Sequence, residues 1–511
     1  MSRRIGIASL IWGLSILLSR VVGLFREATI GRVLGGGAQA DLYLASFTLP
    51  DILYQLLAGG ALSVVFIPIF GGYLARGEEE KGWQAASVIA TALLLLFGVS
   101  FAAMWIAAPE LVGWLTPGFD ATQTAALVRL TRIMLPAQLF HLLGGLLSAT
   151  LQARDKHTLA ALAPLVYTGC IIAGGLIGGA SSGAEGFAWG VVVGSVLGPF
   201  GLPLYGCLQT GLKLRLDFRF NDPDLKLWLV RTLPVMLGWS IVVVDDWFLR
   251  RQGSLLHEGA IATVQYAKTL MRVPMGVFGF ATGVAAFPTL TRLYAQGKGD
   301  EAYATLSGAV RRMLVLAFAS QVALTVAGPE IAQVIYGGRI SAAQHQDIGV
   351  ALALTSLGLW AWAAQTVVAR GFWAMGRTWG PTLVGTAIAA AAYPLYPLLG
   401  QRWGTAGLSV ASTVAISVYV VVLIVWLRRS APGVADGYLG FFARMIPAVG
   451  LGIGAGAWVR TWLDVPLPLV RGALLVAVGV AVYGAVALAL RLPDAVEVLG
   501  LIRARVRRRR A

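Results

Sequence analysis

The sequence predicts an all-α polytopic membrane protein with two six-helix lobes and two further helices. Of its 511 residues, 57% are hydrophobic and only 13% are charged, whereas soluble globular proteins average about 25% charged residues. The chain therefore has too little polar surface for a water-soluble protein. A membrane-spanning helix needs about 20 mostly apolar residues, and about fourteen segments meet that requirement. They lie near 5–33, 41–74, 83–108, 121–153, 158–179, 186–209, 226–250, 259–292, 302–336, 346–374, 379–400, 404–427, 438–462 and 469–490.

Basic residues outnumber acidic ones. The chain has 40 Lys and Arg residues against 24 Asp and Glu residues, which gives a formal net charge of +16. In a membrane protein such an excess is typical of cytoplasmic loops and of contacts with inner-leaflet headgroups. We therefore expect membrane lipids, and not nucleic acid, as the partner of these charges. The most basic stretch is the C-terminal tail, with Arg503, Arg505, Arg507, Arg508, Arg509 and Arg510.

The distribution of Lys and Arg among the loops predicts the orientation of the chain. The connections near 34–40, 109–119 and 180–185 contain no Lys or Arg, whereas alternate segments, beginning with Arg3 and Arg4, are rich in them. Short cytoplasmic loops carry the excess of positive charge in membrane proteins. Both termini are therefore expected to be cytoplasmic, and the number of spans is expected to be even.

An internal repeat predicts the domain organisation. The pair Ile67-Pro68 is followed by Tyr73-Leu74-Ala75, and 220 residues later Phe287-Pro288 is followed by Leu293-Tyr294-Ala295. An offset that covers six predicted helices is typical of parallel repeats related by an axis along the membrane normal. The predicted parts are an N-terminal six-helix lobe at 1–212, a cytoplasmic linker at 213–226, a C-terminal six-helix lobe at 227–430, two additional helices at 431–492 and a basic cytoplasmic tail at 493–511.

Charged residues inside the apolar segments are the candidates for function. A charge at the centre of a bilayer is costly unless it faces a cavity or a partner. Lys268 and Arg272 are four residues apart and so share one helical face. We expect these charges to line a cavity between the two lobes. They are Arg20 and Arg26 in the first segment, Asp41 and Asp51 in the second, Asp245 and Asp246 in the seventh, and Lys268 and Arg272 in the eighth.

The basic members of this set predict an anionic substrate. The planar fork of arginine donates two parallel hydrogen bonds and suits phosphate, so a phosphate or pyrophosphate is the expected ligand. Asp41 and Asp51 are expected to orient the cations or to join a gate. The alternative for any one of these residues is an ion pair within the membrane, such as Arg26 with Asp41 or Lys268 with Asp245. The predicted substrate-binding residues are Arg20, Arg26, Lys268, Arg272, Asp41 and Asp51.

Asp245 and Asp246 are also candidates for a cation or proton site that would couple transport to Na⁺ or H⁺. Their alternatives are pairing with Arg250 or a position in water at the rim. Two cysteines and four scattered histidines lack the spacing of a metal site or a catalytic nucleophile. No nucleotide-binding or hydrolase motif is present either. The sequence therefore predicts a transporter without a resident cofactor, and not an enzyme, driven by an ion gradient, the membrane potential or the gradient of its substrate.

Two groups of motifs resemble a known family. The first group is Ser19-Arg20-Val21-Val22-Gly23-Leu24-Phe25-Arg26-Glu27, Ala40-Asp41, Leu49-Pro50-Asp51-Ile52-Leu53 and Gly60-Ala61-Leu62-Ser63. The second is Val244-Asp245, Tyr266-Ala267, Gly276-Val277-Phe278-Gly279 and Phe287-Pro288-Thr289-Leu290. Together they resemble the MurJ/MviN lipid II flippases of the MOP exporter superfamily, and the likeness extends over essentially the whole chain.

The resemblance implies a fold of two six-helix lobes, with the last two helices forming a groove for a polyprenyl tail. It implies a multi-pass protein of the bacterial cytoplasmic (inner) membrane that works with the cell-wall synthesis machinery. Its substrate would be the undecaprenyl-pyrophosphate-linked peptidoglycan precursor, moved from the inner to the outer leaflet by alternating access. The family's cavity arginines fall on Arg20 and Arg26, and its acidic residue of the second helix falls on Asp41.

This chain also departs from the family pattern. Tyr54 and Thr269 stand where the family usually has arginine, Gly59 stands where it has glutamate, and Arg272 replaces an acidic residue. Relocated charge with the same ligand is one interpretation, and a flippase for another polyprenyl-linked oligosaccharide is another. A cation-coupled small-molecule exporter of the same superfamily and a non-transporting scaffold for cell-wall assembly are the remaining alternatives.

Overall fold

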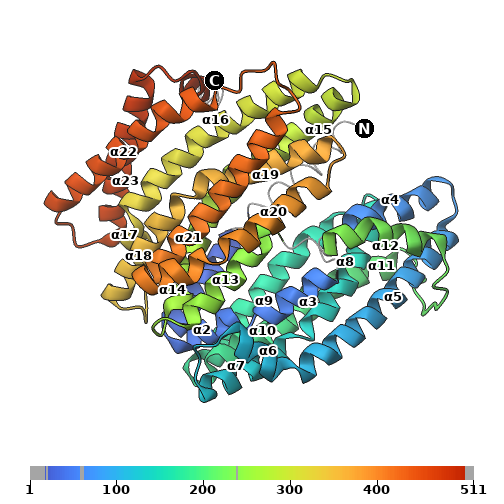
Figure 1. The fold of residues 1–511 in the computed structure, drawn as a ribbon. Coiled ribbons are helices and arrows are strands. Elements are labelled where there is room, and N and C mark those ends of the chain that lie inside the picture. Colours follow the sequence, from blue (N-terminus) through green and yellow to red (C-terminus); the bar gives the residue numbers. More distant parts are fainter. Residues whose placement is uncertain (1–17, 19–20, 58–61, 237–239, 501–511) are drawn as a thin grey trace, which may run out of the picture. The chain divides into compact units, whose positions relative to one another are not determined.

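The computed structural model describes residue 18 and residues 21–57, 62–236 and 240–500, and the regular secondary structure of these residues is entirely helical (Figure 1). The prediction of an all-α membrane protein is confirmed. The chain divides into two compact units. Unit 1 comprises Met1–Gly238 and His257–Ala262, and unit 2 comprises Trp239–Leu256 and Thr263–Ala511. The predicted basic tail from residue 501 onward lies outside the described residues.

Unit 1 combines short helices with a few long ones. Its helical elements are residues 21–34, α2 (Ala38–Ala45), α3 (Thr48–Leu56), α4 (Leu62–Ala75), α5 (Glu79–Ile106), α6 (Ala108–Leu115), α7 (Ala121–Met134), α8 (Ala137–Ala153), α9 (Thr158–Ser182), α10 (Ala184–Ser195), the π-helix η1 (Val196–Gly201), α11 (Leu202–Gln209) and α12 (Pro223–Met236).

The helices of unit 2 are longer on average than those of unit 1. Helix α14 begins in the short segment His257–Ala262, which belongs to unit 1, and continues into unit 2 from Thr263 onward. Its elements are α13 (Ile241–Ser254), α14 (Ala260–Pro274), the π-helix η2 (Met275–Phe280), α15 (Ala281–Ala295), α16 (Gly299–Val326), α17 (Gly328–Tyr336), α18 (Ala342–Ser356), α19 (Leu359–Ala374), α20 (Trp379–Ala392), α21 (Leu395–Arg428), α22 (Tyr438–Trp462), α23 (Pro468–Ala489) and a last helical turn region at 493–500. Helices α22 and α23 lie side by side and pack on α16 (Figure 1).

Among the described residues, nine helices are long and apolar enough to cross a membrane, and the bent pair α18 and α19 would make a tenth span. Several predicted spans are instead broken into shorter helices. The predicted segment 41–74 becomes α2, α3 and α4, and 379–400 is interrupted between α20 and α21. Proline explains both breaks, because it lacks an N–H and clashes with the carbonyl four residues earlier. Pro50 lies four residues after Ser46, the residue that follows the end of α2, and Pro394 lies between α20 and α21.

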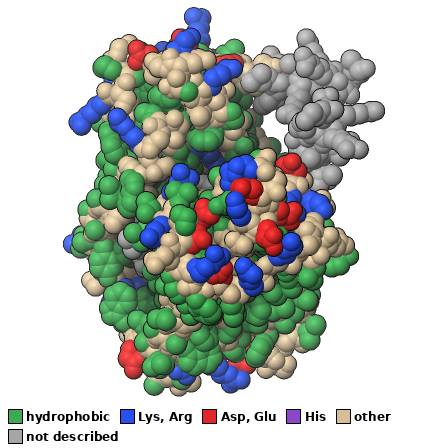
Figure 2. Space-filling view, turned by 90° about the vertical axis from the view of Figure 1, so that its right-hand side faces the viewer, with side chains coloured by type: hydrophobic (Ala, Val, Ile, Leu, Met, Phe, Trp, Pro, Cys, Tyr) green, Lys and Arg blue, Asp and Glu red, His purple; other side chains and the backbone are tan. Residues whose placement is uncertain are grey.

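Close helix packing explains part of the high glycine content. Helices α9 and α10 approach so closely that a Cβ on Gly174 would lie 2.5 Å from the carbonyl oxygen of Gly186. Small residues allow such contact in membranes, where van der Waals packing replaces the hydrophobic effect between helices. Outward surfaces carry large apolar side chains such as Ile106 and Ile177, which are 74% and 86% exposed. Figure 2 shows charged and hydrophobic surface on one face, where acidic and basic side chains gather above a broad hydrophobic area.

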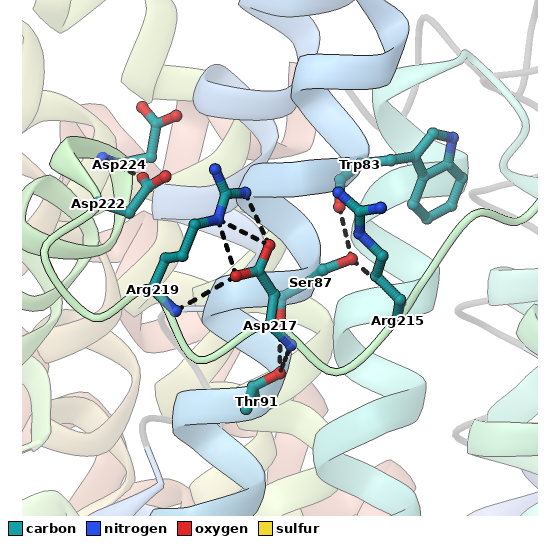
Figure 3. Close-up of polar contacts among 8 residues, drawn as sticks. All are labelled: Trp83, Ser87, Thr91, Arg215, Asp217, Arg219, Asp222 and Asp224. Atoms are coloured by element: carbon teal, nitrogen blue, oxygen red, sulfur yellow. Dashed lines mark hydrogen bonds and ion pairs between the residues drawn. The ribbon is translucent and has the colours of Figure 1, made fainter.

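The linker after α11 is fixed to the side of α5 (Figure 3). The backbone N–H of Arg215 donates to Ser87 Oγ at 3.1 Å, and that of Asp217 donates to Thr91 Oγ1 at 2.9 Å. The two spacings match, because four helical residues rise about 6 Å and two extended residues advance about 6.6 Å. Arg219 donates to Asp217 Oδ2 at 2.7 Å, and this hydrogen bond lowers the pKa of the Asp217 carboxyl. Sequence alone predicted the linker but not this attachment.

Candidate functional site

Asp41 caps a helix that begins more than two hundred residues later. Its Oδ2 accepts the backbone N–H of Gly259, and its Oδ1 accepts that of Ala262, both at 2.7 Å. Gly259 immediately precedes α14 and Ala262 lies in its first turn, where the N–H groups have no acceptor within the helix. The carboxylate is 3% exposed. The described contacts of Asp41 include no ion pair with Arg26, which was the alternative to its predicted role. The carboxylate instead caps α14, a role that the sequence did not predict.

Arg26 lies on the helix that ends at Leu34, and its neighbour Glu27 holds it. Arg26 Nε and Nη2 donate to Glu27 Oε1 at 3.0 Å and 2.5 Å. The side chain of Arg26 remains 30% exposed, against 10% for Glu27. A partly accessible guanidinium with one carboxylate partner keeps donors for a second anion. Arg20, the other predicted cation of this segment, lies outside the described residues.

Tyr54, which stands where the MurJ/MviN family usually has an arginine, begins a row of three aromatic rings. Tyr54 on α3 meets His141 edge to face with ring centroids 6.4 Å apart, and His141 meets Tyr167 in the same way at 5.1 Å. Such pairs favour edge-to-face geometry. His141 Nδ1 also lies 3.0 Å from the carbonyl oxygen of Ala137. Asp51, also on α3, is exposed.

In unit 2, four predicted residues come together as one charge cluster, formed by Asp245 and Asp246 of α13 and Lys268 and Arg272 of α14. Lys268 Nζ contacts Asp245 Oδ2 and lies 2.5 Å from Asp246 Oδ1. Arg272 Nη2 donates to both oxygens of Asp246, at 2.9 Å and 2.7 Å. As their spacing predicts, Lys268 and Arg272 reach the same carboxylate. Two acids and two bases leave the cluster with no net formal charge.

The inner half of the charge cluster is fully enclosed. The Lys268 side chain is 1% exposed and that of Asp245 is not exposed at all. Asp245 also accepts hydrogen bonds from the hydroxyls of Tyr396 and Ser412, the latter at 2.9 Å. Lys268 Nζ lies 4.9 Å from the centroid of the Trp362 ring, within the range of a cation–π contact. Lys268 therefore occupies the position beside Asp245 and Asp246 where a separate cation was expected.

The outer half is more accessible, because the side chains of Asp246 and Arg272 are 19% and 37% exposed. Lys268 does not fit the predicted role of a substrate-binding group, since removing it from its carboxylates would leave buried charges unpaired. Arg272 keeps accessible surface but also gives its Nη2 to Asp246. Arg26 lies in unit 1, whereas Lys268 and Arg272 lie in unit 2. Neither unit by itself therefore contains all of the predicted substrate-binding cations.

Sequence reasoning missed three residues of unit 2 with a polar role. Tyr396 and Ser412 complete the charge cluster, but hydroxyls in apolar helices give no charge signal. The third is Arg370 on α19, which lines a pocket of about 290 Å³ together with Gln365 and Thr382. A signal for Arg370 was present, because it is the one basic residue in the predicted segment 346–374.

Comparison with known proteins places these features in a family. The model of the family described as lipid II flippase MurJ matches residues 30–465. The chain is 29% identical over 435 residues to a probable lipid II flippase MurJ of Rhizobium tropici, covering 82% of this chain and 80% of that protein. It is 28% identical over 469 residues to the lipid II flippase MurJ of Burkholderia cenocepacia, covering 88% and 89%.

Solved structures show the same fold. The chain is similar to a lipid II flippase MurJ in an inward closed conformation, with a TM-score of 0.78 and 17% identity over 94% of this chain and 99% of that one. It is also similar to an inward-facing multidrug resistance MATE family transporter of the MOP superfamily, with a TM-score of 0.67 and 16% identity over 80% of this chain and 94% of that one. At such identities the likeness concerns the fold alone. The family match covers most of the sequence and agrees with the predicted motifs, and the chain therefore belongs to the lipid II flippase MurJ family of transporters.

Proposed function

We propose that this protein moves lipid II, the undecaprenyl-pyrophosphate-linked peptidoglycan precursor, from the inner to the outer leaflet of the bacterial cytoplasmic membrane. The family match over residues 30–465 carries the proposal. A relative from Burkholderia cenocepacia, which is named a lipid II flippase, supports it, because the alignment covers about nine tenths of both proteins. A flippase needs no resident cofactor, because it changes the position of its substrate and not its bonds.

The proposed mechanism is alternating access between a lobe at 1–212 and a lobe at 227–430, with both termini in the cytoplasm. Repeat-built transporters work by rocking one repeat against the other around a binding site. Helices α22 and α23 would form the groove for the polyprenyl tail. Their exposed faces are apolar, with Trp458 and Leu469 66% and 67% exposed.

In unit 1, Arg26 is the proposed pyrophosphate-binding residue, together with Arg20. Arg26 keeps accessible surface and spare donors while Glu27 fixes its orientation. Arginine holds phosphate oxygens by two parallel hydrogen bonds, which lysine cannot reproduce. Asp41 is proposed to act on the helix it caps and not on the substrate. In unit 2, Asp245 and Lys268 are proposed to hold α13 and α14 together, and no separate coupling ion is assigned to them.

Complementation tests the proposal. The wild-type chain, produced in cells depleted of their own lipid II flippase, is expected to restore growth and the appearance of lipid II in the outer leaflet. Arg26→Ala is expected to abolish both at normal expression. Arg402→Ala is the matched control, because Arg402 is an exposed arginine on α21.

Two outcomes would contradict the proposal in different ways. Failure of the wild-type chain to restore flipping, with the protein folded in the membrane, would remove lipid II as the substrate. If Arg26→Ala and the control Arg402→Ala both keep full activity, Arg26 is not part of the binding site, but the proposed function stands.

A further inference from the structure

A pocket in unit 2 holds an arginine, Arg370, that no carboxylate of the described residues neutralises. The pocket has a volume of about 290 Å³ and lies between α13, η2, α19, α20 and α21. Polar lining residues come from α19 and from neighbouring elements, and the aromatic lining comes from Phe280 of η2, Trp373 of α19 and Tyr419 of α21. The lining includes Phe280, Gln365, Thr366, Arg370, Trp373 and Thr382.

Arg370 differs from the other intramembrane cations described above. Arg26 donates to Glu27, and Lys268 and Arg272 donate to Asp245 and Asp246. Arg370 Nη1 instead donates to the backbone carbonyl of Thr366 at 2.6 Å. Within the described part of the chain, no Asp or Glu oxygen lies within ion-pair distance of it. A half-buried positive charge without a counterion attracts an anion strongly, because little water competes there.

The guanidinium of Arg370 is held in a defined position. Its Cζ lies 5.0 Å from the centroid of the Phe280 ring, which is a cation–π distance. Gly283 provides the space on the other side, since a Cβ there would lie 2.0 Å from Arg370 Nη1. Within the described ranges Arg370 contacts one aromatic ring and one carbonyl, so most of its five N–H donors have no acceptor among these residues.

Other groups of the pocket complement an oxyanion. The Gln365 amide and the Thr382 hydroxyl make no hydrogen bond within the described residues, and both line the same space. Trp373 and Phe280 are 46% and 42% exposed, so apolar rings border the opening. A site that binds the phosphate headgroup of an amphiphilic lipid is expected to have hydrogen-bond donors inside and aromatic surface at its edge, as this pocket has.

We propose that the Arg370 pocket is the phosphate-binding site of unit 2 and that it receives the phosphate-bearing headgroup of the transported lipid. This inference rests on the proposed function for the identity of that lipid. It moves the anion-binding role in unit 2 from Lys268, which is enclosed by its own carboxylates, to a residue of α19. Arg370 would hold two phosphate oxygens with its fork, and Gln365 and Thr382 would donate to the remaining oxygens.

Binding to the purified full-length protein tests the site. The probe is undecaprenyl pyrophosphate, with phosphatidylglycerol and inorganic pyrophosphate as competitors. Arg370→Gln is expected to weaken binding by at least about tenfold, because it removes the charged donor of the hydrogen bonds to phosphate. Arg370→Lys keeps the charge without the fork and is expected to recover part of the affinity. Arg377→Gln, seven residues along at an exposed position after α19, is the matched control and is expected to bind like the wild type.

The outcomes separate the sources of phosphate. Weak competition by phosphatidylglycerol and by inorganic pyrophosphate supports a site for the polyprenyl pyrophosphate. Equal competition by phosphatidylglycerol would overturn the link to the transported lipid, and equal competition by inorganic pyrophosphate would show that the lipid plays no part. Unchanged binding in Arg370→Gln, with a wild-type unfolding temperature, would overturn the site itself.

Flipping assays keep this test apart from the proposed function. If the wild type moves lipid II and Arg370→Gln binds and moves it equally well, the pocket assignment fails and the proposed function stands. If the wild type does not move lipid II but Arg370→Gln loses binding of the pyrophosphate lipid, the proposed function fails and the phosphate site stands.

Discussion

Asp41 accepts a hydrogen bond from the backbone of Gly259, 218 residues along the chain, at 2.7 Å. The contact has a counterpart in the opposite direction, because Glu258 Oε1 accepts the N–H of Ala38 at 2.8 Å. Ala38 is the first residue of α2 and Ala260 is the first residue of α14. Asp41 of α2 thus provides an acidic acceptor at the positive N-terminus of α14, and Glu258, just before α14, provides one at the N-terminus of α2. The spacing of these two helix starts is close to that of the sequence repeat.

Replacement of Asp41 tests this cap. Asp41→Ala is expected to lower the free energy of unfolding by about 1–3 kcal/mol, because two N–H donors would be left without an acceptor in a buried place. The measurement is the apparent unfolding temperature in detergent. Asp51→Ala serves as the control, since Asp51 is an exposed acidic residue on the neighbouring helix α3. Equal unfolding temperatures for the two variants would contradict a capping role.

Gly259 is expected to tolerate no side chain. Its φ is +86°, and a Cβ would lie 2.0 Å from the carbonyl oxygen of Gly36. Gly297 has a similar φ of +74° with nothing within 4 Å of its Cβ position. Gly297→Ala should therefore cost only the left-handed strain of about 1–2 kcal/mol, and Gly259→Ala should cost clearly more. The difference in unfolding temperature isolates the steric clash, and a difference of zero would refute it.

Lys268 and Asp245 are expected to depend on each other for stability. Lys268→Met leaves Asp245 buried without its cation, and breaking a buried pair in this way costs about 3–5 kcal/mol. Lys268→Met combined with Asp245→Asn removes both charges and should be more stable than Lys268→Met alone. Unfolding temperatures of the two single variants and the double variant form a double-mutant cycle. Additive effects would mean that the two charges do not stabilise each other.

The linker should become accessible when its hydroxyl partners on α5 are removed. Thr91→Val deletes the acceptor of the Asp217 N–H while keeping the shape of the side chain. Trypsin is expected to cut faster at the exposed Arg215 and Arg219 in this variant. Ser100→Ala removes a hydroxyl from the same helix away from the linker and is expected to leave the rate unchanged. A rate that rises equally in both variants would indicate general loosening of α5.

The same attachment is expected to weaken in acid. The hydrogen bond from Arg219 lowers the pKa of Asp217 from its ordinary value of 3.8. A group with a lowered pKa contributes stability above its ordinary pKa and loses that contribution as the pH falls through the folded value. We expect an acid-active protease to cut the linker of Asp217→Asn faster than that of the wild type near about pH 5. The cutting rates of the wild type and of Asp217→Asn should converge at lower pH, because the carboxyl of Asp217 becomes protonated there. A ratio of the two rates that does not change with pH would contradict the titration of Asp217.

Much of the fold was predictable because the membrane imposes simple rules on the sequence. Long apolar segments had to be helices, since backbone groups find no partners in lipid. The breaks in 41–74 and 379–400 were less visible, although Pro50 and Pro394 cause them. The ion pair between Lys268 and Asp245 was the alternative to the predicted substrate-binding role of Lys268, and it was foreseeable because charge is rare in apolar helices. Sequence gave no comparable signal for Tyr396 or Ser412.

By itself, the sequence determined that this chain is a helical membrane transporter, where its charged residues lie, and which family it belongs to. The tertiary structure decided what each charge does. Among the residues that the structure describes, Lys268 is neutralised by two carboxylates and Arg370 by none, and Asp41 is occupied with backbone N–H groups 218 and 221 residues away. The physical reason is that a charge in a low-dielectric interior takes its role from the groups within a few ångströms of it. Those neighbours come from helices far apart in the chain, and only folding brings them together.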